Sequence, residues 1–431
     1  MAISRGRARR APRLCFPASP CAGGHPMRRK IFGRQASFLT AAAVVAHTIW
    51  TSAAPVLTYP IYAHEWGLST FSTTAIFAVY PVFVVLVLVL FGNLSDYIGR
   101  RETMLIGLFA STIGSLIFAI APDIYWIFVG RAFMGIGVGL SAGPSAAAVL
   151  EFSAPDKLKQ AGSVTAVAQA IGMSGAALVG GALIQYAPFP SRLNFAVLTG
   201  ILVLVTIATW HLPNRTASRP HGKWRPGIPS IPNGFFAPFV SATAAVTTAY
   251  VLGAMTLSLG AQVAHDVVAS TNALMNGGII TIFAVSSAFA TAPVRGRSPG
   301  SVLRIGAVIG LLSVGCLAIA AEEQLLIVFA SAQIGAGVAY SLLLLGGLSL
   351  INEGASKTHR AATLSALFLV AYLAQAVVAL SLGRIATTAG LANAVVTGVA
   401  LIAVLAVITL LLDAVRIRTM RANHSRARHD P

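Results

Sequence analysis

Residues 92–101 read Gly-Asn-Leu-Ser-Asp-Tyr-Ile-Gly-Arg-Arg and place a short, charged turn between two long apolar runs. The runs at 72–94 and 103–121 are each about long enough to cross the hydrocarbon core of a bilayer as a helix. Backbone polar groups in lipid must be satisfied within their own segment, so we expect both runs to be helical. A polytopic membrane protein needs such a turn where neighbouring spans meet water.

The composition of the whole chain agrees with this interpretation. Hydrophobic residues make up 56% of the 431 residues, charged residues only 10%, and the mean hydropathy is +0.79. A soluble domain carries about a quarter charged residues. The net charge of +18 could suggest nucleic acid as a partner, but the basic residues lie in the tails and in every second loop. We therefore expect an integral membrane protein that contacts the lipid bilayer and binds no nucleic acid.

Twelve apolar runs are long enough to be spans. They cover residues 39–62, 72–94, 103–121, 125–149, 161–185, 193–211, 236–261, 271–292, 302–321, 325–350, 361–383 and 390–413. Prolines and basic residues interrupt the pattern between the sixth and seventh runs, which indicates a linker. The predicted parts are a disordered basic tail (1–37), a six-helix half (38–212), a linker (213–234), a second six-helix half (235–414) and a basic tail (415–431). The fold class is an all-α membrane protein with twelve transmembrane helices in two pseudo-symmetric halves.

The basic residues also predict an orientation. On one side of the predicted spans lie 27 of the 30 lysines and arginines, the outer loops hold Arg192 and Arg384, and Arg131 lies within a span. Because cytoplasmic loops carry the excess of lysine and arginine, both termini are expected in the cytoplasm. We expect a multi-pass protein of a bacterial cytoplasmic (inner) membrane.

The fourth span of each half carries a similar segment. Residues 131–138 read Arg-Ala-Phe-Met-Gly-Ile-Gly-Val, and residues 331–338 read Ser-Ala-Gln-Ile-Gly-Ala-Gly-Val. The glycines and the valine recur at an offset of 200. Internal repeats of this kind are common in transporters, so the pattern favours a duplicated fold.

The turn at 92–101 resembles the loop signature of the major facilitator superfamily, read as G-x-L-x-D-x-x-G-R-R. Gly92, Asp96, Gly99, Arg100 and Arg101 occupy its defining positions. Gly92 is expected to let two helices approach closely, and Gly99 to adopt a positive φ. The resemblance implies a secondary transporter in which this loop braces the two halves on the cytoplasmic side and takes part in switching. The alternative is a charged interfacial turn with no moving role.

Arg131 is the charge that most needs an explanation. Burying an arginine in a span costs roughly 2.5–3.5 kcal/mol on insertion scales, so it should face protein or a water-filled cavity. Residues 131–139, Arg-x-x-x-Gly-x-Gly-x-Gly, resemble the fourth-helix motif of the superfamily, whose arginine is associated with proton coupling. Alternatively, Arg131 neutralises carbonyls or a carboxylate without moving.

Two further residues are candidates for coupling. All 12 acidic residues fall in loops, in tails or at span ends, so we expect no carboxylate deep in the membrane. Glu151, at the inner end of the fourth span, either titrates or pairs with Arg100. His47, in the first span, can exchange protons near neutral pH or simply hydrogen-bond a neighbouring backbone group.

Candidates for the substrate cavity are aromatic and amide residues within spans. They are Trp50, Tyr80, Gln169, Tyr250, Gln333, Tyr340, Tyr372 and Gln375, together with His47. A cavity with these groups, one cation and no buried anion suits a neutral, amphipathic or anionic substrate. The sequence predicts no cofactor, no metal site, no catalytic residues and a monomer.

The fifth span bears on the direction of transport. Its glycines at 172, 175, 180 and 181 partly resemble the antiporter motif of drug exporters, but Ala176-Ala177 stand where Gly-Pro is expected. A small-residue packing face explains them equally well. Our first hypothesis is a proton-coupled exporter of small amphipathic compounds. An importer or facilitator of a small, possibly anionic, metabolite and a non-transporting membrane sensor are the alternatives, and an enzyme is not expected.

Overall fold

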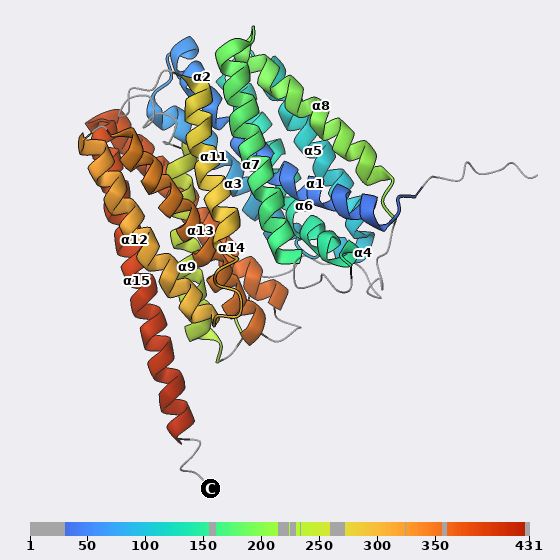
Figure 1. Ribbon diagram of the computed structural model, residues 1–431. Helices are drawn as coiled ribbons and strands as arrows, with labels where there is room; N and C mark the ends of the chain where they lie inside the picture. Colours follow the sequence, from blue (N-terminus) through green and yellow to red (C-terminus); the bar gives the residue numbers. More distant parts are fainter. Residues whose placement is uncertain are drawn as a thin grey trace, which may run out of the picture.

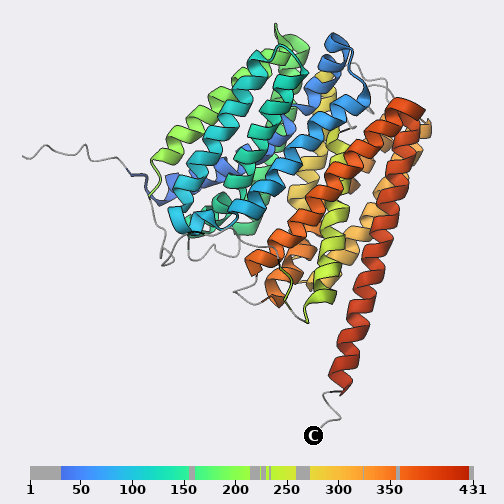
Figure 2. The ribbon, with the colours of Figure 1, turned by 180° about the vertical axis from the view of Figure 1, so that it is seen from behind.

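The computed structural model describes residues 31–154, 161–213, 224, 230–232, 234–258, 272–323, 325–355 and 360–426. Within these ranges, twelve helical segments are long and apolar enough to cross a membrane, as predicted. The predicted tail at 1–30, most of the linker and residues 427–431 lie outside the described residues. Figures 1 and 2 show two groups of helices lying side by side.

The N-terminal half contains α1 (Arg34–Ala53), η1 (Val56–Thr58), α2 (Tyr59–Trp66), α3 (Thr70–Phe91), α4 (Leu94–Ile98), α5 (Arg100–Ile120), α6 (Ile124–Phe152), α7 (Ala161–Tyr186) and α8 (Pro190–Trp210). Its first span is built from α1, η1 and α2 together. Pro55 lies at the break because proline removes a backbone donor and disrupts the helix. The turn at 92–101 is more ordered than predicted, since α4 occupies its centre.

The C-terminal half contains α9 (Phe236–Ser258), α11 (Ala273–Ala290), α12 (Pro299–Glu323), α13 (Leu326–Gly354), α14 (Arg360–Ala389) and α15 (Leu391–Arg426). Helix α15 continues past the predicted end of its span at residue 413, so residues 415–426 of the predicted basic tail are helical. At the other terminus the disordered tail predicted for 1–37 is too long, because α1 begins at Arg34.

The same packing pattern occurs in both halves. In the N-terminal half α6 packs against α1, α3 and α5, and in the C-terminal half α13 packs against α9, α11 and α12. The pairs α5–α8 and α12–α15 also correspond. Between the halves, α3 packs on α14 and α11 packs on α7. Each half therefore offers its second and fifth spans to the other, as two-fold pseudo-symmetry requires.

The predicted offset of 200 between the halves is wrong in detail. Gly135 lies against α3, whereas Gly335 lies against Ser313 of α12. Gly137 contacts α5 and Gly139 contacts α3, while Gly337 contacts α11. Matching helix faces therefore align Gly137 with Gly335 and Gly139 with Gly337. The glycines recur because each lets a neighbouring helix approach, and the shared valine is incidental.

One acidic residue is more buried than its predicted place suggests. Asp413, predicted at a span end, lies near the end of the last span and is fully buried, where it forms ion pairs with Arg304 and Arg416. A buried carboxylate is tolerable where cations satisfy it, and both arginines lie close by in the fold.

Candidate functional site

Arg131 lies at the centre of the candidate site, on α6, and its side chain is fully buried. Its Nε donates a hydrogen bond to the Tyr59 hydroxyl at 3.1 Å, and its Nη2 donates to the same oxygen. Its Nη1 donates to the backbone carbonyl of Ser52 at 3.1 Å. Among the described residues, no carboxylate forms an ion pair with Arg131. The buried cation is held by neutral oxygens.

The break in the first span explains how this is possible. Helix α1 ends at Ala53, so the carbonyls of its last turn lack intrahelical partners. Ser52 offers its carbonyl to Arg131, and the Ala54 carbonyl accepts a hydrogen bond from Asn194 Nδ2 at 3.1 Å. A helix C-terminus also carries a partial negative charge of roughly half an elementary charge. The interrupted helix therefore supplies the electrostatic stabilisation that a carboxylate would otherwise give.

Two aromatic rings complete the surroundings of Arg131. Its guanidinium carbon lies 5.6 Å from the ring centroid of Tyr59 and 5.5 Å from that of Tyr80. Cations within about 6 Å of an aromatic centroid are attracted by the ring quadrupole. Tyr80 belongs to α3, one of the helices that face the other half. Arg131 thus contacts Tyr80, whose helix packs against the other half.

The C-terminal half places an aromatic cluster at the same interface. Tyr250 packs edge-on against Tyr372 at 4.6 Å and lies 6.4 Å from Tyr340 between ring centroids. Phe283 and Phe368 extend the cluster onto α11 and α14. Tyr80 lies on α3, which packs on α14, the helix of Tyr372. The predicted cavity residues Tyr250, Tyr340 and Tyr372 are therefore brought together, and Tyr80 lies on a helix that packs against them.

The other predicted cavity residues lie elsewhere. His47 Nδ1 contacts the Val44 carbonyl of its own helix, and its Nε2 lies 3.5 Å from Ser111 Oγ on α5. His47 is thus buried inside the N-terminal half and turned away from the second half. Trp50 packs against Gly175 of α7. The backbone contact of His47 was one of its two predicted interpretations.

The three glutamines are scattered. Gln333 lines a cavity of about 20 Å³ among α9, α12 and α13, which has room for about one water molecule. Gln375 is buried on α14, and its Oε1 has no hydrogen-bond partner among the described residues. Gln169 is half-buried on α7. Gln333 shares α13 with Tyr340 and Gln375 shares α14 with Tyr372, whereas Gln169 lies in the other half.

The loop at 92–101 forms a charge cluster at one end of the bundle, which we call the motif end. Gly99 has φ 107°, the positive value predicted for it. Arg100 Nη1 pairs with Glu151 Oε2 at 2.6 Å, and Arg101 Nη1 donates to the Leu212 carbonyl at 3.5 Å. Asp96 forms no ion pair with any described residue, so its bracing role stays a prediction.

Contacts of this loop with the other half are sparse. Gly92 lies near Ser365 of α14, at a distance that a Cβ would also allow, so the close helix approach expected of it stays a prediction. Trp224, from the linker, donates to Asn93 Oδ1 at 2.9 Å and stacks on Phe91. Ser230, further along the linker, accepts a hydrogen bond from Thr363 of the C-terminal half at 3.3 Å. The linker therefore contacts both halves.

At the other end of the bundle, which we call the opposite end, the halves contact each other directly. The Phe71 amide donates to Thr387 Oγ1 at 2.9 Å, joining α3 to α14. The Ala273 amide donates to Gln185 Oε1 at 2.9 Å, joining α11 to α7. Gly383 lies directly against Thr74 across the same interface. In this conformation the two halves are closed together at the opposite end.

The glycines of α7 allow close packing with α1 of the same half and with α11 of the other half. Gly172 lies against the Ala46 carbonyl and Gly181 against Ala273. Gly180 faces Asn194, at a greater distance. These contacts explain the small residues as packing sites, one of the two interpretations predicted for them.

Sequence reasoning missed Tyr59 and Ser52, which hold Arg131. Neither belongs to a recognisable motif. The available signal was the pair of prolines at 55 and 60, because a broken span leaves carbonyls and side chains inside the membrane that need partners.

Comparisons with known proteins agree with the fold. Residues 39–379 match the profile of the Major Facilitator Superfamily. An MFS-type transporter of Aspergillus terreus is 34% identical over 95 residues, which cover 22% of this chain and 17% of that protein. The chain therefore aligns with only a small part of that relative.

Two solved structures are similar over most of their length. A bacterial homologue of the human lysosomal transporter Spinster, inward-facing and unoccupied, has a TM-score of 0.68 at 15% identity, covering 88% of this chain and 97% of that one. A POT family transporter in complex with a thioalcohol-conjugated peptide has a TM-score of 0.72 at 12% identity, covering 89% and 96%. At these identities the likeness concerns the fold alone.

Proposed function

We propose that this chain, which belongs to the major facilitator superfamily, carries a small amphipathic anion across the membrane by alternating access. The observation that carries the proposal is the buried Arg131, whose hydrogen-bond partners are all neutral. A buried arginine that is not paired with a carboxylate of the protein is a suitable partner for a substrate carboxylate or phosphate. This favours the anionic-substrate hypothesis over a strongly cationic cargo.

The proposed binding step exchanges one set of Arg131 partners for another. Tyr59 accepts two N–H groups of Arg131 through a single oxygen, whereas a carboxylate can accept two N–H groups with two charged oxygens. Charge-assisted pairs are roughly twice as strong as hydrogen bonds between neutral groups. The apolar part of the substrate would then lie against the tyrosines of the C-terminal half, whose rings offer apolar surface with polar edges.

The proposed switching step uses the pseudo-symmetric contacts between the halves. With the motif end in the cytoplasm, as the charge asymmetry predicts, the closed opposite end faces outward. Transport then requires the contacts of α3 with α14 and of α7 with α11 to separate there while the motif end closes. Rocking of two halves around a central site is the general mechanism of such folds.

Proton coupling is a separate part of the proposal. Glu151 is engaged by Arg100, and His47 faces the interior of one half, so neither faces Arg131. We infer that any coupling acts through the Arg131–Tyr59 pair. The glycines of α7 had favoured export by antiport, but helix packing accounts for them. The Arg131–Tyr59 pair is therefore the remaining feature on which the hypothesis of proton-coupled antiport depends.

Flux into vesicles tests the proposal. Purified protein in lipid vesicles is given small aromatic carboxylates and their neutral amides, with and without a proton gradient. We expect flux of the carboxylates, lost in Arg131→Gln and retained in the control Arg192→Gln, whose side chain is exposed at the opposite end. Equal flux of acids and amides through the wild type, or unchanged carboxylate flux through a folded Arg131→Gln variant, contradicts anion recognition by Arg131. Binding without flux identifies a sensor, and flux unaffected by collapse of the gradient excludes proton coupling.

A further inference from the structure

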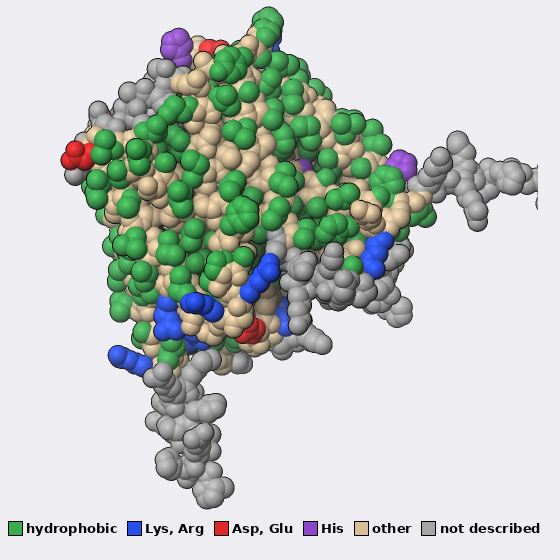
Figure 3. Space-filling model, viewed as in Figure 1, with side chains coloured by type: hydrophobic (Ala, Val, Ile, Leu, Met, Phe, Trp, Pro, Cys, Tyr) green, Lys and Arg blue, Asp and Glu red, His purple; other side chains and the backbone are tan. Residues whose placement is uncertain are grey.

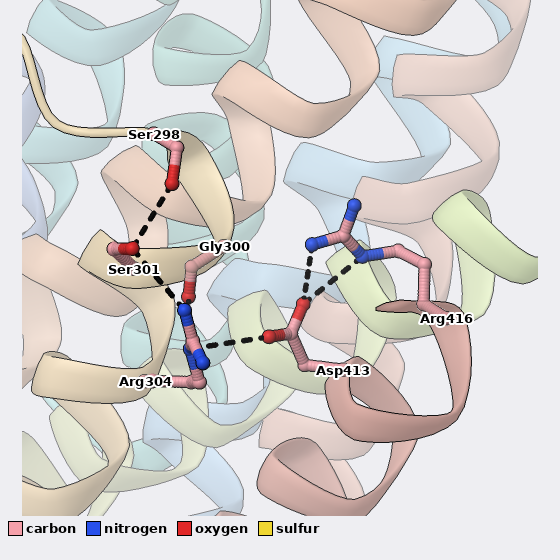
Figure 4. A network of polar contacts seen from close by, with 6 residues as sticks. All are labelled: Ser298, Gly300, Ser301, Arg304, Asp413 and Arg416. Atoms are coloured by element: carbon pink, nitrogen blue, oxygen red, sulfur yellow. Dashed lines mark hydrogen bonds and ion pairs between the residues drawn. The ribbon is translucent and has the colours of Figure 1, made fainter. Parts of the chain in front are cut away.

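A buried charge cluster joins α12 to α15 at the motif end (Figure 4). Asp413 is completely buried and accepts hydrogen bonds from Arg416 Nε at 3.0 Å and Nη2 at 2.6 Å. Arg304 Nε lies 3.5 Å from the other carboxylate oxygen. Gly300 leaves the space that the cluster needs, since a Cβ there would meet Arg416. The two helices are therefore locked together at this end.

The cluster carries more positive than negative charge. One carboxylate is shared by two arginines, and Arg416 is buried beside it. The side chain of Arg304 is 47% exposed and is oriented by the Gly300 carbonyl and the Ser301 hydroxyl, both at 3.2 Å. An arginine that is held in a fixed orientation, with part of its guanidinium exposed, can donate hydrogen bonds to an anion outside the protein.

Arg304 also continues an apolar stripe along α12. Val308, Leu312 and Ile319 are exposed and follow Arg304 at helical spacing, so they share its face. In a protein that spans a bilayer, an exposed apolar stripe faces lipid tails. The guanidinium of Arg304 therefore lies where this lipid-facing stripe ends.

Helix α15 repeats the arrangement beside it. Val404, Leu411 and Val415 are exposed on one face, and Arg418, also exposed, follows Val415 by three residues. Helices α12 and α15 are in contact and lie at the edge of the bundle in both ribbon views (Figures 1 and 2). Two neighbouring lipid-facing stripes thus end in arginines at the same end of the molecule.

The surface of the molecule agrees with this placement. In Figure 3, basic side chains gather along the lower edge of the C-terminal half, below a surface of hydrophobic side chains. Basic residues at the level of the lipid headgroups attract anionic lipids. We propose that the motif ends of α12 and α15 form a binding site for the phosphate headgroup of an anionic phospholipid, with Arg304 and Arg418 as its charged partners.

In this site Asp413 is a positioning residue. It holds Arg416 inside the protein and fixes one side of Arg304, while the free side of Arg304 and the whole of Arg418 face the lipid. The lipid tails would lie along the two apolar stripes. A soluble phosphate ion has no tails to place there, so the site should discriminate strongly in favour of lipid.

Lipid binding to the full-length protein in detergent micelles tests the proposal. Phosphatidylglycerol or phosphatidylcholine is added, and bound lipid is counted by native mass spectrometry while the melting temperature is recorded. We expect wild type to bind and be stabilised by phosphatidylglycerol, more weakly at high salt. Arg304→Gln with Arg418→Gln should weaken this binding roughly fivefold for each arginine, the equivalent of about 1 kcal/mol each.

Two controls keep the test decisive. Arg192→Gln with Arg384→Gln removes two exposed arginines at the opposite end and should bind phosphatidylglycerol as wild type does. Arg418→Gln alone leaves the Asp413 cluster intact, so its loss of lipid binding cannot be attributed to unfolding. Unchanged binding in Arg418→Gln, an equal loss in the opposite-end control, or the same stabilisation by inorganic phosphate would each overturn the proposal.

Discussion

Removing one oxygen atom from Tyr59 tests the central claim that neutral groups hold Arg131. In Tyr59→Phe the ring remains, so the cation–π contact at 5.6 Å is kept. The hydroxyl that accepts from both Nε and Nη2 is lost. Among the described residues, only the Ser52 carbonyl then remains as a hydrogen-bond partner of the guanidinium. The variant therefore isolates the hydrogen bonds from the rest of the packing.

The size of the effect follows from these bonds. A hydrogen bond to a charged group contributes about 1.5–3 kcal/mol, and a buried donor left without a partner costs a similar amount. Nε and Nη2 of Arg131 both lose the Tyr59 hydroxyl as their acceptor. A small movement of the arginine side chain toward other groups offsets part of this loss. We expect the free energy of unfolding to fall by about 2–3 kcal/mol, which is roughly 30- to 150-fold in the unfolding constant.

Tyr62→Phe is the matched control. Tyr62 is also buried in α2, and its hydroxyl lies near Thr58 but makes no hydrogen bond of standard geometry with a described residue. Removing an unsatisfied hydroxyl should leave the free energy of unfolding unchanged or raise it slightly. Both variants are compared with wild type by chemical unfolding in detergent micelles, followed by tryptophan fluorescence. Equal losses in the two variants, or no loss in Tyr59→Phe, would refute the reasoning.

Four further substitutions probe the packing and the ion pairs, each by the same unfolding measurement. Gly137→Ala places a Cβ against the backbone of α5 and should destabilise. Gly200→Ala, inside α8 with open space beside it, should instead stabilise by about 0.5–1 kcal/mol. The reverse order would contradict the assigned helix contacts. Asp413→Ala leaves two arginines without their carboxylate and should cost about 3–5 kcal/mol. Arg100→Gln breaks the partly exposed pair with Glu151 and should cost under about 1 kcal/mol, so a much larger loss of stability would show that the pair is not solvent-screened.

The candidate site was only partly predictable. Tyr80, Tyr250, Tyr340 and Tyr372 could be named because few polar groups occur within the spans, and Arg131 because its charge is costly there. His47 was chosen on the same ground, yet it faces the interior of one half. Which side of a helix a residue occupies depends on the neighbouring helices, and one sequence does not specify them.

The class of the protein, its twelve spans and its two halves can be derived from the amino-acid sequence. Those features follow from local physics, because twenty apolar residues in lipid must form a helix and a charged turn must lie at water. Helix packing, in contrast, was needed to show that Tyr59 and the end of α1 hold Arg131, and that Asp413 is buried between Arg304 and Arg416. The reason is that a buried charge is stabilised by groups distant in the chain, and only packing brings them within hydrogen-bonding distance.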